Sequence, residues 1–299
     1  MKDFRVGYLY SLAPIHCGSE GDLGNISEIA REVHTNFPYI PGSSLRGSLR
    51  NEVEEDRDLE VANRLFGQEL TDGKMGVHQI WFGDARLLWV PMRTMSVKGE
   101  DVFTWVSCPT LLRDCALISR RTFDGFAALT SAVGSRKDVY MVADARIEVE
   151  AMNEEQIRSI ELTENWSASL GNDTKSQWEN NRIVLPDNDF QVLMEHSLWT
   201  QVRNVIADTG GADMFWTDVC IPRDTIFYYA WGYSVAKKDP VRAADCEVMQ
   251  EILTGLIQVG GQANVGRGWV QSWVADNRSP ILETAVKTAA SEAKSAYAD

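Results

Sequence analysis

The sequence is poor in the residues that build disulfide frameworks and metal centres. Its 299 residues include five cysteines and four histidines. The cysteines are odd in number, scattered along the chain and form no C-x-x-C pair, so neither a disulfide framework nor a zinc site is expected. The histidines do not follow a metal-ligand spacing either. We therefore expect no tightly bound metal or other cofactor.

Long apolar runs are also missing. No run approaches the length of a membrane span, and the first residues, MKDFR, do not begin the apolar core of a signal peptide. We therefore expect a cytoplasmic protein with no membrane partner. The chain has 44% hydrophobic and 24% charged residues and no clear linker. This favours one elaborated domain over residues 1–279, followed by a helical tail over residues 280–299.

Basic residues are in deficit, because the net charge is −14. This weighs against a non-specific nucleic-acid binder, which would normally be basic. The deficit is uneven, however. Residues 145–190 contain ten acidic and four basic side chains, so this window alone contributes −6. The acidity could lie on one outer face, and global charge does not decide whether another face binds RNA.

Periodicity and turn residues predict an α+β fold, a sheet with helices on one face. Strands are expected over residues 4–12, 77–82, 85–90, 102–107, 139–150, 225–234 and 269–274. Helices are expected over residues 45–66, 110–118, 123–133, 190–207 and 246–259. Residues 162–181 are polar and are expected to form a loop-rich excursion.

The segment at residues 41–50, PGSSLRGSLR, predicts a helix start. Pro-Gly signals a turn, and Ser43 or Ser44 is a suitable N-cap. Arg46 and Arg50 then share one face near the start of the helix. A helix N-terminus offers unpaired N–H groups and partial positive charge, so these residues could cradle a phosphate. The alternative is an ordinary capped amphipathic helix with solvated arginines.

A second candidate is the glycine-rich loop over residues 260–268, GGQANVGRG. It lacks the Lys-Ser/Thr ending of a nucleotide P-loop, and it follows a helix and precedes a strand, the reverse of a dinucleotide fingerprint. Its four glycines, with Gln262, Asn264 and Arg267, still permit close approach to a phosphate backbone. The alternative is a tight structural turn.

Support for catalysis is weaker. His16 lies beside a glycine-rich polar loop and could act as a general acid or base, although a lone histidine at a strand end is more often structural. The carboxylates Asp22, Glu28, Glu32 and Asp84 are too scattered to indicate a divalent-ion site. The chain shows no Ser-His-Asp order with a nucleophile elbow, which disfavours acyl-transfer hydrolysis.

Several motifs occur together in a fixed order. They are His16-x-Gly18, REVHTNFPYIPGSSLRG over residues 31–47, Phe82-x-Asp84-Ala85-Arg86-Leu87-Leu88, Phe103-x-Trp105-Val106-x-Cys108-Pro109, Ile221-Pro222-x-Asp224-Thr225-x-Phe227-Tyr228 and Gly266-Arg267-Gly268. Together they closely resemble the RAMP backbone subunit of type III-B CRISPR effector complexes, the fourth subunit of the Cmr set. The resemblance runs from the first strand to Trp269.

The resemblance implies a modified ferredoxin-like (RRM-like) palm with an inserted β-hairpin thumb at roughly residues 204–222. It implies copies stacked along a CRISPR guide RNA, with complementary target RNA and other effector subunits as partners. The thumb would include Met214, Phe215, Trp216 and Asp218, the first three packing on bases. The residues expected against the guide backbone are Ser43, Ser44, Arg46, Arg50, Gly261, Gln262, Asn264, Gly266 and Arg267.

One departure concerns catalysis. Family members carry an Asp that supports metal-dependent cleavage of target RNA, and its position here falls on Ser27. A serine hydroxyl cannot replace a carboxylate as a metal ligand or base at neutral pH. Cleavage would then require Glu28, with His16 and perhaps Asp22, and an added Mg²⁺ or Mn²⁺ ion. The remaining alternatives are a guide-processing RAMP nuclease and a stand-alone RRM-like module that binds single-stranded RNA.

Overall fold

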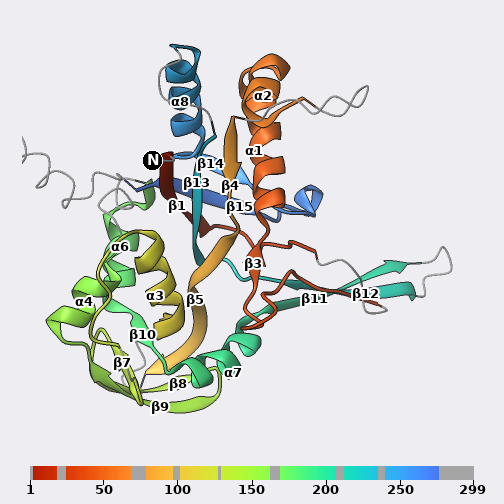
Figure 1. The fold of residues 1–299 in the computed structure, drawn as a ribbon. Coiled ribbons are helices and arrows are strands. Elements are labelled where there is room, and N and C mark those ends of the chain that lie inside the picture. Colours follow the sequence, from red (N-terminus) through yellow and green to blue (C-terminus); the bar gives the residue numbers. More distant parts are fainter. Residues whose placement is uncertain are drawn as a thin grey trace, which may run out of the picture.

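The computed structural model describes residues 3–18, 25–68, 79–96, 102–126, 129–161, 169–206, 212–234 and 240–275. Figure 1 shows a body made of sheet and helices, from which one long hairpin projects. The predicted tail at residues 280–299 lies outside the described residues. Among the helices that the structure describes, none is both long enough and apolar enough to cross a bilayer.

A twelve-stranded sheet forms the body. Ten of its strands follow one continuous path: β1 (Asp3–Ser11), β5 (Ala85–Ser96), β6 (Phe103–Ser107), β7 (Ala132–Gly134), β8 (Asp138–Val142), β9 (Ala145–Ala151), β10 (Arg182–Val184), β13 (Ile226–Tyr233), β14 (Leu256–Gln258) and β15 (Trp269–Val274). Their order in space is β14-β15-β1-β13-β5-β6-β10-β7-β9-β8. The short strands β3 (Tyr39–Ile40) and β4 (Ile80–Phe82) pair with β5 and β13.

β1 is an inner strand of this sheet. It pairs antiparallel with β13 on one side and with β15 on the other. Because alternate residues of a strand point to opposite faces, Leu9 enters one hydrophobic core while Tyr8 and Tyr10 enter the other. The predicted alternation of residues 4–12 is therefore confirmed, and the sheet is buried on both sides.

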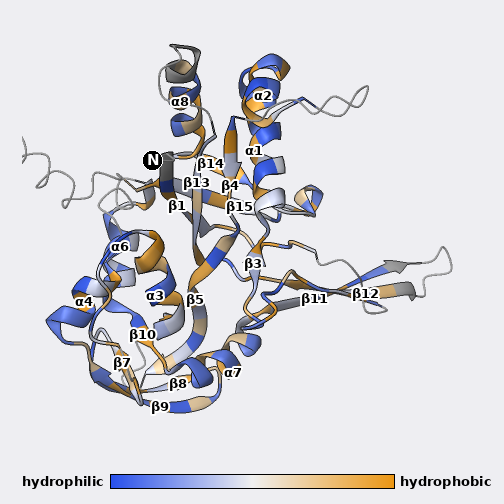
Figure 2. Cartoon of the chain, viewed as in Figure 1, coloured by the Kyte–Doolittle hydropathy of each residue, from blue (hydrophilic) through white to orange (hydrophobic). Residues whose placement is uncertain are grey.

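One face of the sheet is covered by α1 (Gly42–Asp56), α2 (Leu59–Phe66) and α8 (Pro240–Ile252). Hydrophilic and hydrophobic residues interleave along α1 and α2, as expected for helices with one buried side (Figure 2). A bidentate ion pair joins α2 to α8, with Arg64 Nη2 2.7 Å from Asp245 Oδ1. The pair links two helices of this layer to each other.

The opposite face is covered by α3 (Pro109–Ile118), α4 (Glu154–Ile160) and α6 (Asn172–Asn180). Its core is aromatic. Tyr8 stacks on Trp273 with ring centroids 5.3 Å apart, and Trp89 meets Trp178 edge to face at 5.8 Å. These rings are fully buried. These four aromatic side chains are therefore enclosed by the helices and are not displayed on the sheet surface.

The projecting hairpin consists of β11 (Trp199–Ile206) and β12 (Ala212–Cys220), and we call it the thumb hairpin. The two strands pair antiparallel from Trp199↔Cys220 outward. A two-residue strand, β2 (Ile26–Ser27), adds to β12 in parallel and completes a separate three-stranded sheet. α7 (Asp187–Ser197) leads into the hairpin and packs on the same core as α1.

Several expectations from sequence are wrong. The helix expected over residues 190–207 ends at Ser197, and the thumb hairpin begins at Trp199 rather than near residue 204. Two segments were assigned the wrong type: residues 123–126 and 129–131 form coil before β7, and the supposed loop at 162–181 contains α6. Three segments that were each predicted as one element contain two. Residues 139–150 form the β8–β9 hairpin, residues 45–66 contain α1 and α2, and residues 246–259 contain the end of α8 and β14.

Candidate nucleic-acid interface

The glycine-rich loop connects β14 to β15 and contains one turn of 3₁₀ helix, Ala263–Val265. It is held against the segment that follows β1, because Gly261 N–H donates to His16 O at 2.8 Å and Gly268 N–H donates to Pro14 O at 2.9 Å. Gly260 and Gly268 have φ of +82° and +85°. A Cβ at Gly268 would lie 2.1 Å from Val259 O. These two glycines are required by the fold itself.

Gly261 differs from them. Its φ lies outside the left-handed region, and the nearest atom to a Cβ placed there would be His16 O at 3.7 Å. Gly261, Asn264 and Gly266 are all exposed. This part of the loop therefore leaves backbone, an amide side chain and open space accessible to a ligand.

Arg267 does not share this exposure. Only 5% of it is accessible, and its guanidinium faces the thumb hairpin. Nη1 donates to Asp218 Oδ2 of β12 at 3.0 Å, and Nη2 donates to Gln201 Oε1 of β11 at 2.7 Å. Since Gln201 and Asp218 are register partners, one guanidinium spans both strands. Arg267 is thus a structural tie between the loop and the hairpin.

Asp218 is the centre of this contact and is fully buried. It also accepts from Arg203 Nη1 at 3.1 Å and from Gln262 Nε2 at 3.2 Å. Burial alone would raise the pKa of Asp218, but the hydrogen bonds from Arg203 and Gln262 and the charge of Arg267 outweigh burial and lower it. Asp218 is therefore a carboxylate already neutralised by two arginines.

Gln262 completes the contact. It has φ of +64°, which is uncommon for a residue with a side chain. Its amide donates to Asp218 and its Oε1 accepts from Arg267. We refer to Gln201, Asp218, Gln262 and Arg267 as the Arg267 clamp.

His16 lies near the clamp and is buried, with 5% of its surface accessible. Its Nδ1 is 2.8 Å from Val219 O, and its Nε2 is 3.3 Å from Ser27 Oγ. Both ring nitrogens therefore have partners within the fold. The carboxylate of Glu28 faces a different partner, since Glu28 Oε2 lies 3.9 Å from Arg31 Nη2. The structure brings His16 and Ser27 together and places Glu28 elsewhere.

These groups do not fit a divalent ion. A hard cation needs several convergent oxygen ligands. Ser27 is the register partner of Asp218, yet both Asp218 oxygens are taken by Arg203, Arg267 and Gln262. Within the described ranges, no group of three or more His, Cys, Asp or Glu side chains could hold a metal ion; Asp22 lies outside those ranges.

The N-terminus of α1 is not capped by a serine, although a serine cap was expected. Pro41 is the N-cap residue, and Asp84 Oδ1 accepts from Gly42 N–H at 2.7 Å. Ser43 and Ser44 lie inside the first turn, the former exposed and the latter half-buried. The cap prediction is therefore wrong, although both serines remain at the helix N-terminus as expected for an anion contact.

Arg46 and Arg50 point toward the end of α2. Arg46 donates to Phe66 O, and Arg50 donates to Gly67 O at 2.9 Å and to Asn63 Oδ1 at 2.8 Å. Burial and the neighbouring Arg50 charge lower the pKa of Arg46. Both arginines satisfy C-terminal carbonyls of α2, and both remain partly accessible.

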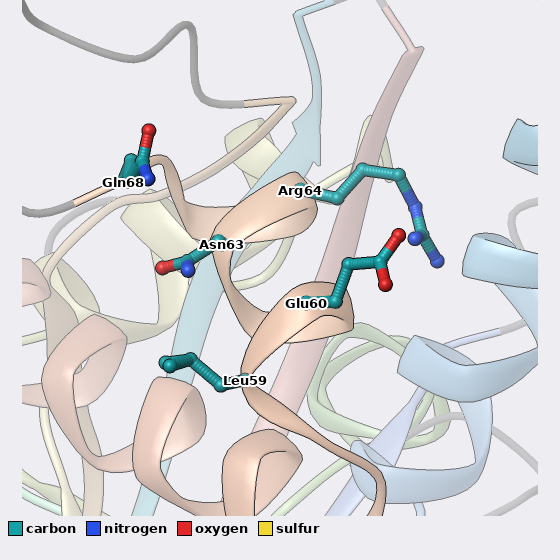
Figure 3. Close-up of a pocket in the computed structure, with 5 residues that line it drawn as sticks. All are labelled: Leu59, Glu60, Asn63, Arg64 and Gln68. Carbon is teal, nitrogen blue, oxygen red and sulfur yellow. The ribbon is translucent and has the colours of Figure 1, made fainter.

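A shallow pocket lies on α2, lined by Leu59, Glu60, Asn63, Arg64 and Gln68. Figure 3 shows Glu60 and Arg64 extending together toward α8, where Arg64 meets Asp245. Because Asn63 already accepts from Arg50 and Arg64 is paired, the pocket offers few free polar groups. We assign it no ligand.

The predicted thumb residues occupy different environments. Phe215 is 58% exposed. Trp216 is half-buried and carries Arg203 above its ring, with Cζ 5.2 Å from the centroid. Asp218 is buried in the clamp, and the side chain of Met214 lies outside the described part of the chain. The sequence did not predict that Gln201 and Arg203 belong to this site, because residues 190–207 were predicted as a helix. Both lie on β11, where Gln201 is the register partner of Asp218 and Arg203 that of Trp216.

Comparisons with known proteins agree with this geometry. The model of the RAMP superfamily matches residues 8–271. The CRISPR system Cmr endoribonuclease Cmr4 of Pyrococcus furiosus is 31% identical over 293 residues, covering 91% of this chain and 95% of the relative. A crystal structure of oligomeric Cmr4 from the same organism is 26% identical, with a TM-score of 0.69 and coverage of 92% and 98%.

A further structure matches in fold. The type III-B Cmr-beta complex in its apo state contains a chain that is 18% identical, with a TM-score of 0.70 and coverage of 91% of this chain and 97% of that one. The resemblance identified from the sequence motifs is confirmed by the family match and by the identity to Cmr4. The chain belongs to the RAMP superfamily and, within it, to the Cmr4 family of type III-B CRISPR systems.

Proposed function

We propose that this chain is a guide-RNA-binding backbone subunit of a type III-B CRISPR complex. Copies would assemble along the CRISPR RNA, hold complementary target RNA and contact other subunits. Family membership supports this, since the relative from P. furiosus is named as a Cmr protein and another Cmr4 structure from that organism is oligomeric.

The observation that carries the proposal is the exposed part of the glycine-rich loop. Gly261 has neither a conformational nor a packing reason to be glycine, so close approach of a ligand is the remaining reason. The loop is fixed to a projecting hairpin that exposes Phe215. A backbone-binding loop beside an exposed aromatic suits single-stranded RNA, which is bound through phosphates and stacked bases.

We also infer that the palm is ferredoxin-like. The spatial order β15-β1-β13-β5, with every neighbouring pair antiparallel, supports this topology. So does the chain order, because α1 lies between β1 and β5 and α8 lies between β13 and β15. An RRM-like module would bind RNA on the sheet face opposite these helices, but α3, α4 and α6 cover that face. The stand-alone RRM-like alternative is therefore disfavoured.

The proposal includes no cleavage step by this chain. The family Asp position is Ser27, Glu28 is paired with Arg31, and Asp218 is neutralised by arginines. Holding guide and target needs no metal, so no cofactor is proposed. The endoribonuclease alternative predicts metal-dependent cuts in complementary RNA that are lost on Glu28→Ala.

The decisive experiment uses Gly261→Asp, which places a negative charge at the open point of the loop. We expect it to abolish co-purification of guide RNA. Gly255→Asp is the matched control, since Gly255 lies at the other end of β14, has ordinary φ and has its nearest contact at 3.5 Å. The control should retain RNA. Equal RNA retention by both variants would contradict the assigned interface.

A second measurement separates a filament from an isolated module. The number of protomers bound per RNA, measured by mass photometry, should rise stepwise as the guide is lengthened. A constant single protomer on every RNA length would instead support the stand-alone alternative.

A further inference from the structure

The Arg267 clamp joins two elements that the proposed function uses for different tasks. The glycine-rich loop would contact the guide backbone, and the thumb hairpin would enter the paired bases. Resting on that function, we propose that the clamp is a positioning device, which fixes the angle of the thumb hairpin relative to the guide backbone. Asp218, Gln201 and Gln262 are then positioning residues and do not themselves touch RNA.

The geometry of the clamp favours this role over a simple loop anchor. Arg267 reaches β11 and β12 at the same register step, through Gln201 and Asp218. A guanidinium has a planar, fixed fork of donors, so two acceptors on neighbouring strands define an orientation as well as a distance. A single contact to one strand would define a distance alone.

Burial makes the clamp hard to open. Asp218 is fully buried and Arg267 is 95% buried, as 5% of it is accessible. Separating them would leave an unpaired buried charge on each side. Gln262 is also held in a left-handed conformation while bonded to both charged groups. An unusual backbone conformation maintained by such contacts is typical of functional sites.

The hairpin needs such a device because it projects from the body (Figure 1). Beyond the clamp, Val202, Asn204 and Phe215 are exposed, so this part of the hairpin is not packed on the sheet. A small rotation at the foot would therefore displace Asn204 and Phe215 by a larger distance. Fixing the foot fixes where this part of the hairpin meets the guide–target duplex.

The test uses the assembled complex with guide and labelled complementary RNA. Gln201→Met removes the acceptor on β11 while keeping the side-chain length, and Asp218→Asn removes the charge on β12. Gln250→Met on α8 is the matched control, because Gln250 is also exposed. We expect both clamp variants to retain guide RNA within about twofold of wild type. We expect their target affinity to fall about tenfold, with periodic protection of the target lost.

The outcomes are distinct. If wild type does not retain guide RNA, the proposed function fails. If wild type binds guide and target but Gln201→Met leaves target affinity and footprint unchanged, the clamp inference alone is overturned. Should Asp218→Asn not fold, Gln201→Met still decides, since it alters an exposed side chain. Spin labels at positions 204 and 265 give an RNA-free readout, in which the distance distribution should broaden in the clamp variants and stay narrow in the control.

Discussion

Replacement of Gly47 by alanine should stabilise the free protein and weaken its binding to RNA. Gly47 is exposed inside α1, and no atom lies within 4 Å of a Cβ placed there. Glycine in a helix interior costs about 0.5–1 kcal/mol relative to alanine. Nothing in the described fold compensates for this cost. The expected reason for the glycine is a ligand that approaches the helix surface closely.

The expected size follows from these values. A gain of about 1 kcal/mol raises the unfolding midpoint by roughly 2 °C in a protein of this size. Ser43, one turn earlier on the same face, is the exposed serine of the proposed anion site, so an added methyl at Gly47 would hold a phosphate backbone away from it. We expect guide affinity to fall about tenfold, which corresponds to about 1.4 kcal/mol.

Calorimetry of the free protein and RNA titration of the same preparation measure the two effects. Asn51→Ala is the control, because Asn51 is exposed one turn later and alanine also raises helix propensity there. It should stabilise the protein without a comparable loss of affinity. A Gly47→Ala variant that is more stable and binds RNA as tightly as wild type would refute the reasoning.

Two further predictions concern the loop and the clamp. Gly268→Ala should lower the free energy of unfolding by more than about 2 kcal/mol, because its Cβ would lie 2.1 Å from Val259 O at φ of +85°; unchanged denaturant unfolding would contradict this. The pKa of Asp218 is lowered in the fold, so its contribution to stability is present above the ordinary aspartate pKa and is lost as pH falls below about 4. The difference in unfolding free energy between wild type and Asp218→Asn should therefore shrink from pH 5 to pH 3, and a constant difference would exclude Asp218 as the titrating group.

The parts of the fold that sequence predicted well are those whose pattern is local. β1 and β13 are buried strands bounded by turn residues, and α1 shows Leu45, Leu49 and Val53 at helical spacing. β11 could not be read in the same way. Its sequence continues from α7 without a strong turn signal, and its strand conformation depends on pairing with β12. Tertiary pairing of this kind overrides local propensity.

The same distinction between local patterns and tertiary contacts applies to the candidate site. The sequence predicts a site at the glycine-rich loop and at the serines of α1, because glycine clusters and helix starts have local signatures, and this remains a prediction. It assigned Arg267 to phosphate, whereas the structure turns this side chain toward Asp218, 49 residues away in the chain. Whether an arginine is free or neutralised depends on contacts that no local pattern reports.

Several arginines of this chain are paired with carboxylates, and this pairing suggests a reason for copies of the chain to assemble along RNA. Arg203 and Arg267 share Asp218, Arg64 is paired with Asp245, and Arg86 with Glu32. Within the described part of the chain, these four arginines are therefore neutralised by carboxylates, and the net charge of the whole sequence is −14. Several of the chain's proposed RNA contacts are backbone N–H groups and short polar side chains, which individually contribute little. Many copies on one guide bind with high effective concentration, so assembly supplies the affinity that a single subunit lacks.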